Sequence, residues 1–142
     1  MTISVHARLI AGLMFVSVPS IQYGGVFLLS LLSKRDSGYV QNPLRQNLFR
    51  AGHAHAGVLV ILGLMCQLFA DAISGPAWLI WIARLGVPTA AILIPLGFFL
   101  SVASPNATKP GPWIRAVWGG AIVLGSSVLT LGILLIRSAI YG

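Results

Sequence analysis

Charge and cysteine are both scarce in this chain. Only 8% of its 142 residues are charged, just two of them are acidic, and 57% are hydrophobic. Soluble proteins carry about 25% charged residues, so this composition excludes an ordinary water-soluble domain. Cys66 is the single cysteine, which excludes an internal disulfide and a CxxC metal site. The length predicts one transmembrane domain, residues 1–142, without a separate extramembrane module.

The net charge of +7 raises the question of nucleic-acid binding. Membrane proteins also reach such a balance, because they contain few acids and gather basic residues at helix ends, where these set the topology. No basic face in this sequence is long enough to follow a phosphate backbone. We therefore expect the lipid bilayer as a partner and no nucleic acid.

Four apolar stretches approach or exceed the roughly 20 residues needed to cross a bilayer. They cover about residues 9–32, 51–73, 77–102 and 114–136. Glycine and proline at 74–76 and 110–112 mark turns between them. The sequence therefore predicts an all-α fold, an integral membrane four-helix transmembrane bundle.

Basic residues favour one side of this bundle. The loop 33–50 and the loop before the fourth span contain Lys34, Arg35, Arg45, Arg50 and Lys109. The short loop on the other side has neither Lys nor Arg. The positive-inside rule then predicts a multi-pass protein of the bacterial cytoplasmic (inner) membrane, with both termini outside.

His53 and His55 stand at the start of the second predicted span, where water gives way to hydrocarbon. Ionisable side chains are costly there and usually point into the bundle or toward a ligand. A histidine in such a place can bind a metal or haem iron, or transfer a proton. Two positions along a helix separate side chains by about 200°, so both cannot bind one ion from a regular helix. We expect one to face the interior; the alternative is that both bind headgroups or loop carbonyls.

Four further side chains are candidates for the same site. Arg45 and Arg50 flank the histidines, and their planar guanidinium groups suit carboxylates and phosphates, such as haem propionates or a phospholipid headgroup. The alternative for both arginines is a topological role. Gln22 and Tyr23 lie in a polar belt just after Pro19, and we expect them to line the cavity. The alternative is that this belt satisfies backbone groups freed by a proline kink.

Asp71 and Arg84 carry opposite charges at similar depths in the second and third predicted spans. A short turn joins these spans and brings the two residues together. Each would otherwise be an unpaired charge near lipid. The sequence therefore predicts a structural ion pair, with a small polar site at the outer face as the alternative.

The start of the second span, residues 50–55, resembles the haem-bearing helix in the catalytic subunit of haem-copper oxidases and nitric-oxide reductases. It also resembles small bacterial membrane proteins with a histidine-x-histidine helix start. The resemblance implies that His53 or His55 ligates haem b. No other predicted span contains a histidine, so a second axial ligand would come from another subunit or a symmetric copy.

The chain is also similar to the four-helix membrane glutathione-transferase and eicosanoid-enzyme family. Length, helix number, a basic first cytoplasmic loop and an Arg-Ala-x-His-Ala run agree. This resemblance implies a trimeric enzyme that uses Arg50 and His53 near the cytoplasmic face. His55 and Val58 stand where that family has Asn and Glu.

The whole chain, including residues 97–101 and 130–132, looks like an uncharacterised bacterial four-helix membrane protein family. We predict a small membrane protein that binds haem b or a transition metal at His53 and His55, with a redox or electron-transfer role. The alternatives are a glutathione-transferase-like membrane enzyme and a non-catalytic accessory subunit. Many glycines in the spans indicate a homo-oligomer (dimer or trimer) or a subunit of a larger membrane complex.

Overall fold

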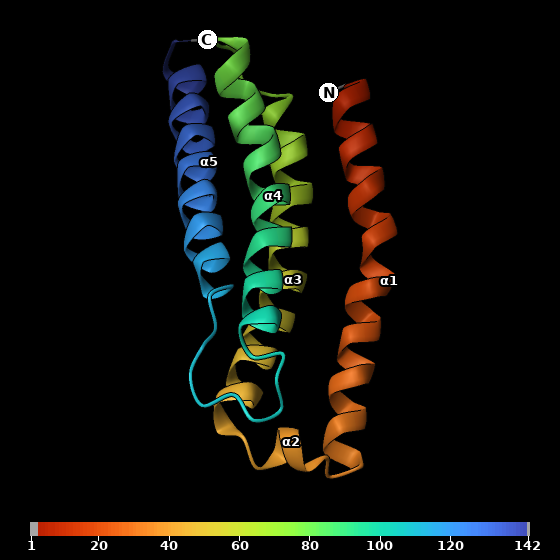
Figure 1. Ribbon diagram of the computed structural model, residues 1–142. Coiled ribbons are helices and arrows are strands. Elements are labelled where there is room, and N and C mark those ends of the chain that lie inside the picture. The colour runs from red at the N-terminus through yellow and green to blue at the C-terminus, as the bar shows by residue number, and fades with distance from the viewer. Residues whose placement is uncertain (1–2, 142) are drawn as a thin grey trace.

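The computed structural model describes residues 3–141, which form a bundle of helices without strands in that range (Figure 1). Its helices are α1 (Val5–Ser33), α2 (Ser37–Val40), α3 (Pro43–Ala70), α4 (Ala77–Ser101) and α5 (Ile114–Tyr141). All but α2 are long and apolar enough to cross a membrane. The chain is therefore an all-α, multi-pass membrane protein, as its composition predicts.

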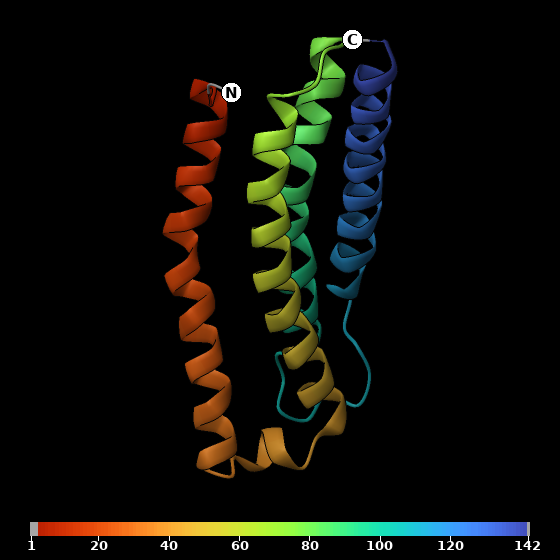
Figure 2. The same ribbon diagram turned by 180° about the vertical axis from the view of Figure 1, so that it is seen from behind.

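The helices α3, α4 and α5 form the tightly packed part of the bundle, and α1 stands beside it (Figures 1 and 2). Among the long helices, α1 packs mainly against α3, whereas α4 packs against both α3 and α5. Both ends of the described chain lie at one end of the bundle, and α2 and the α4–α5 loop lie at the other. Within the described residues, α1 and α4 are therefore not packed closely together.

The helix α3 begins at Pro43, eight residues before the predicted start of the second span. The side chain of Asn42 caps it by accepting a hydrogen bond from the Arg45 backbone N–H at 3.1 Å. Pro43 suits the first helical position because no partner is needed there for its missing N–H. The helix therefore begins before the predicted span, because the Asn42 cap, and not the first apolar residue, sets its first turn.

Glycines allow α4 and α5 to approach closely. A Cβ atom on Gly97 would lie 2.8 Å from the Val117 backbone nitrogen, and one on Gly120 would lie 2.6 Å from Ile94 Cγ1. Real Cβ atoms do not approach so closely, so these positions require glycine for this packing. Small residues at such contacts are typical of membrane helix pairs, whose association depends on close packing in place of a hydrophobic driving force.

Candidate functional site

His53 lies inside the bundle and not at the start of a helix. It comes ten residues after Pro43, about 15 Å along α3 at the usual rise per residue. Its half-buried ring lies against the Gly24–Gly25 pair of α1. Cβ atoms there would be 3.5 Å from Nδ1 (Gly24) and 3.1 Å from Nε2 (Gly25). The glycine pair therefore makes room for the edge of the imidazole that carries both nitrogens.

His55 points elsewhere. It is exposed, and its ring centroid lies 5.3 Å from that of Phe98. With the proton on Nδ1, His55 donates to the Ala51 carbonyl oxygen at 2.7 Å, within its own helix. The structure therefore does not bring His53 and His55 together. Residues 3–141 also contain no group of three or more His, Cys, Asp or Glu side chains suited to a metal ion.

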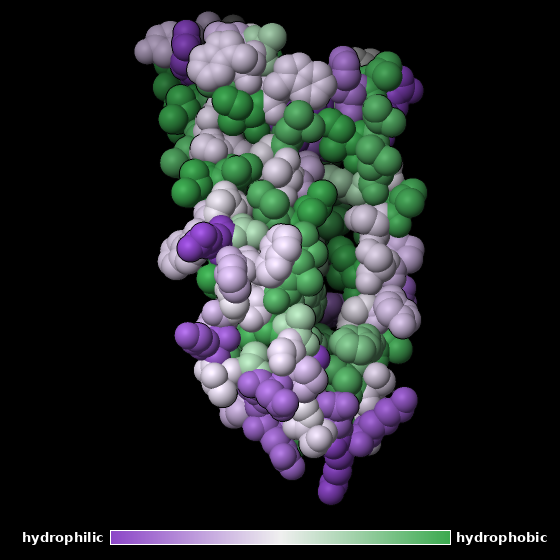
Figure 3. Space-filling view, viewed as in Figure 1, coloured by the Kyte–Doolittle hydropathy of each residue, from purple (hydrophilic) through white to green (hydrophobic). Residues whose placement is uncertain are grey.

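A groove of about 540 Å³ runs between α1 and α4, with α3 as its floor. Figure 3 shows the hollow between α1 and the rest of the bundle, with apolar side chains on both sides. The groove is lined by Ile10, Leu13, Met14, Ser17, Ser20, Ile21 and Gly24 of α1, by His53, Ala56 and Val60 of α3, and by Leu85, Pro88, Ala91, Ile92, Pro95, Leu96 and Phe99 of α4.

Gln22 and Tyr23 do not line this groove, in contrast to the prediction. Both are exposed, and Tyr23 keeps 72% of its surface accessible. Ser17, Ile21 and Gly24 recur at helical spacing and share the face toward the groove, whereas residues 22 and 23 follow Ile21 by about 100° and 200°. The polar residues of α1 therefore lie on two faces of the helix: Ser17 and Ser20 face the groove, and Gln22 and Tyr23 do not.

Arg45 is occupied by contacts within the chain. Its guanidinium group donates to the carbonyl oxygens of Val102 at 3.2 Å, Gly38 at 3.2 Å and Ala103 at 3.4 Å. It also lies 4.8 Å from the centroid of the Phe49 ring. Arg45 therefore ties α3 to α2 and to the end of α4, and most of its donors are not free for a ligand.

Arg50 is exposed and makes no hydrogen bond or ion pair with the part of the chain that the structure describes. It does not line the groove, although it lies only three residues before His53. The structure thus places Arg50 at the surface of α3, where a lipid headgroup or solvent can reach it.

Asp71 and Arg84 form the ion pair that the sequence predicts, with Arg84 Nη2 2.5 Å from Asp71 Oδ1. Arg84 is buried, and Gln67 donates from Nε2 to the Arg84 carbonyl oxygen at 2.8 Å. Pro88, four residues further on, has no N–H to bond that carbonyl, so the Gln67 amide replaces the missing donor. A side chain from the neighbouring helix thus satisfies the carbonyl that Pro88 leaves without its usual partner.

Ser4 extends this network to α1. Its backbone N–H donates to Asp71 Oδ2 at 2.8 Å and its hydroxyl donates to Asp71 Oδ1 at 2.7 Å. Burial alone would raise the pKa of Asp71, but the hydrogen bonds from Ser4 and Arg84, together with the Arg84 charge, lower that pKa below its usual value. The carboxylate therefore fastens the first turn of α1 to α3 and α4.

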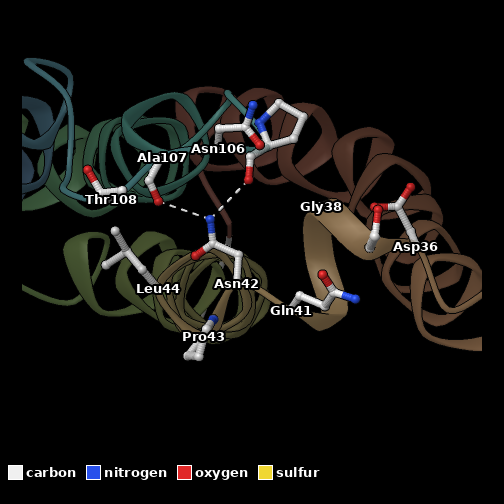
Figure 4. A pocket seen from close by; sticks show the side chains of 11 residues that line it. Asp36, Gly38, Gln41, Asn42, Pro43, Leu44, Asn106, Ala107 and Thr108 are labelled. Atoms are coloured by element: carbon white, nitrogen blue, oxygen red, sulfur yellow. Dashed lines mark hydrogen bonds between the residues drawn. The ribbon is translucent and has the colours of Figure 1, made fainter.

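A second, polar hollow of about 780 Å³ lies at the end of the bundle that carries α2 (Figure 4). Asn42 lies within it and donates from Nδ2 to the carbonyl oxygens of Pro105 at 3.0 Å and Ala107 at 2.9 Å. Its side chain thus joins the start of α3 to the α4–α5 loop. Asp36 is the one acidic residue that lines this hollow.

Comparison with known proteins gives no match: neither a family model, nor a curated protein, nor a solved structure is similar to the chain. The resemblances drawn from residues 50–55 therefore stay predictions. The groove and His53 are the features of the structure that bear on function.

Sequence reasoning missed two parts of the site. They are the Gly24–Gly25 pair, which receives the His53 ring, and Phe99, which lines the groove next to Gly52. Two adjacent glycines within an apolar span do carry a signal, because they favour the close approach of a bulky side chain from another helix.

Proposed function

We propose that this chain is a membrane protein that binds a lipid-soluble redox ligand in the groove between α1 and α4, with His53 as the polar contact of that ligand. One observation carries the proposal. Of the groove's three polar side chains, Ser17 and Ser20 already donate to the carbonyl oxygens of Met14 and Ser17. His53 has no hydrogen-bond partner within residues 3–141. An imidazole at membrane depth is costly unless it has such a partner.

Haem b is the ligand that the motif at residues 50–55 predicts. In this groove its iron would bind His53 alone, because His55 points away. A second axial ligand would then come from another subunit. The arginines contribute differently from the prediction: most donors of Arg45 bond to backbone carbonyls, whereas all donors of Arg50 are free for an acidic group.

We also propose the cytoplasmic membrane of a bacterium as the location, with the end that carries α2 in the cytoplasm. The basic residues at that end support this orientation, since Lys34, Arg35 and Lys109 are all exposed there.

The test is the ligand content of the protein purified from its membranes. Optical spectra and mass spectrometry of extracted small molecules would be recorded for the wild type, His53→Ala and His55→Ala. We expect a bound hydrophobic molecule in the wild type and in His55→Ala, and its loss in His53→Ala. A Soret band with this dependence would identify the molecule as haem b.

Two outcomes would contradict the proposal. A ligand content that is unaffected by His53→Ala would remove the role of the imidazole. Thiol-conjugating activity that is lost in Arg50→Ala, with no ligand dependent on His53, would favour a glutathione-transferase-like enzyme instead.

A further inference from the structure

The groove is long. Along α1 its lining extends from Ile10 to Gly24, about 21 Å at the rise of an α-helix. A groove of this length accommodates an extended hydrocarbon chain that runs along the helices, with a ring at one end.

The polar and aromatic groups of the groove lie at one end. His53 faces Gly24, the last α1 residue of the lining. Phe99, the last α4 residue of the lining, lies against Gly52, where a Cβ atom would be 3.1 Å from Phe99 Cε2. Gly52 directly precedes His53, so the imidazole and the phenyl ring border the same end of the groove. The rest of the lining offers only apolar surface and two engaged serines.

No Lys, Arg, Asp or Glu lines the groove within residues 3–141. A fatty-acid carboxylate or a phosphate headgroup would therefore lose its hydration without gaining a counter-charge, which is unfavourable at membrane depth. A neutral head suits the site better. Imidazole can donate to a carbonyl oxygen or accept from a hydroxyl group, and Phe99 can pack against a ring.

We infer that the groove binds an isoprenoid quinone or its quinol, with the ring between His53 and Phe99 and the tail along α1 and α4. This inference rests on the proposed function and names the ligand class of the same site. A quinone carbonyl accepts a hydrogen bond from His53, and a quinol hydroxyl donates to it. The open side of the groove lets the tail enter from the bilayer, where exposed Leu13 and Ile92 border it.

The experiment uses the full chain in phosphatidylcholine nanodiscs loaded with decylubiquinone. Quinone retained above the level of protein-free nanodiscs is extracted and quantified. We expect about one quinone per chain for the wild type and His55→Ala. Loss of one hydrogen bond in His53→Ala should weaken binding by about tenfold.

Two pairs of variants test the groove itself. Ala56→Phe and Ala91→Phe fill it from α3 and from α4, and both should abolish retention. Ala54→Phe and Thr89→Phe place the same side chain at exposed positions of the same helices outside the lining, and both should retain quinone. Using two blocking variants on different helices keeps the test valid if one of them does not fold.

The outcomes separate the two proposals. Retention that is unchanged in both blocking variants would overturn the quinone site. A Soret band that depends on His53, without quinone retention, would overturn the quinone site and leave the proposed function standing. If neither haem nor quinone depends on His53, both proposals fall.

Discussion

Tyr39 has a fully buried side chain whose hydroxyl has no hydrogen-bond partner in the part of the chain that the structure describes. Its ring packs against Phe49 at a centroid distance of 6.0 Å. A buried, unsatisfied hydroxyl is unfavourable by about 1–3 kcal/mol, whereas its replacement by hydrogen keeps the ring contacts. Tyr39→Phe should therefore raise the free energy of unfolding by about 1 kcal/mol.

Thermal unfolding in detergent, followed by circular dichroism, measures this change. Phe49→Ala is the control and should lower the free energy of unfolding by about 3–5 kcal/mol, because it leaves a cavity in the same cluster. A loss of stability in Tyr39→Phe would reveal a partner for the hydroxyl and contradict the prediction.

Arg84 depends on Asp71 for its counter-charge. Asp71→Asn would leave this guanidinium group buried without an opposite charge, which typically lowers the free energy of unfolding by about 3–5 kcal/mol. The double variant Asp71→Asn/Arg84→Met removes both charges and should recover most of that loss. Chemical denaturation of the wild type, Asp71→Asn, Arg84→Met and the double variant measures the coupling between the two side chains. Equal losses in Asp71→Asn and in the double variant would show that the unpaired Arg84 charge is not what destabilises Asp71→Asn.

The lowered pKa of Asp71 also predicts a dependence on pH. A carboxyl group with a lower pKa in the folded state stabilises fully above its unfolded pKa, about 3.9, and loses this contribution as the pH falls through the folded value. Wild-type stability should therefore fall below about pH 4, and Asp71→Asn should lack this part of the fall. Asp36 is the matched control, since Asp36→Asn changes the only other acid at an exposed position. If the stability of Asp71→Asn depended on pH as that of the wild type does, Asp71 would not be the group whose protonation destabilises the fold.

At the level of the helices, hydropathy predicts the four spans because each is apolar over more than 18 residues. It does not predict where α3 begins, because the polar residues of its first turns cap the helix and pack against α2. His53 therefore lies ten residues into α3, whereas its place at the edge of the apolar stretch predicts a position near the start of the helix. Helical spacing alone does separate His53 from His55, and the structure has them on different faces.

The glycines of the spans show the limit of sequence reasoning most clearly. Gly97 and Gly120 are used between α4 and α5, and Gly24 and Gly25 receive His53. Cβ atoms on five others would meet nothing within 4 Å: Gly12, Gly57, Gly119, Gly125 and Gly132. The oligomer stays a prediction. A sequence shows that helices can approach closely at such residues but not which helix approaches. The groove exists because of how α1, α3 and α4 pack together, so the sequence does not predict the groove either.

Gly119 and Gly120 are neighbours on α5 with opposite surroundings. A Cβ atom on Gly119 would meet nothing within 4 Å, whereas one on Gly120 would meet Ile94. Gly119→Ala should therefore raise the free energy of unfolding by up to about 1 kcal/mol through helix propensity. Gly120→Ala should lower it by about 1–3 kcal/mol through overpacking against α4. Thermal unfolding of both variants shows whether each substitution raises or lowers the free energy of unfolding. Equal effects of the two substitutions would contradict the close contact between α4 and α5 at Gly120.

At the scale of the whole molecule, the two ends of the bundle differ in charge. Exposed basic side chains gather at the end formed by α2 and the α4–α5 loop, and hydrophilic side chains project from that end in Figure 3. The other end has two exposed basic side chains, Arg8 and Arg137, and Arg84, which lies nearer to that end, is neutralised by Asp71. The positive-inside rule therefore predicts that Ser104, in the α4–α5 loop, faces the cytoplasm and that Ser74, in the α3–α4 turn, faces outward.

Thiol labelling of intact cells measures this orientation. Cys66 is buried, and Cys66→Ser provides a background without cysteine. In that background, Ser74→Cys and Ser104→Cys each add one thiol of nearly serine size at an exposed loop position. A membrane-impermeant maleimide should label Ser74→Cys in intact cells and should label Ser104→Cys only after permeabilisation. The reverse pattern would place the basic end outside, and the charges of that end would then have to serve a partner or ligand on the outer face.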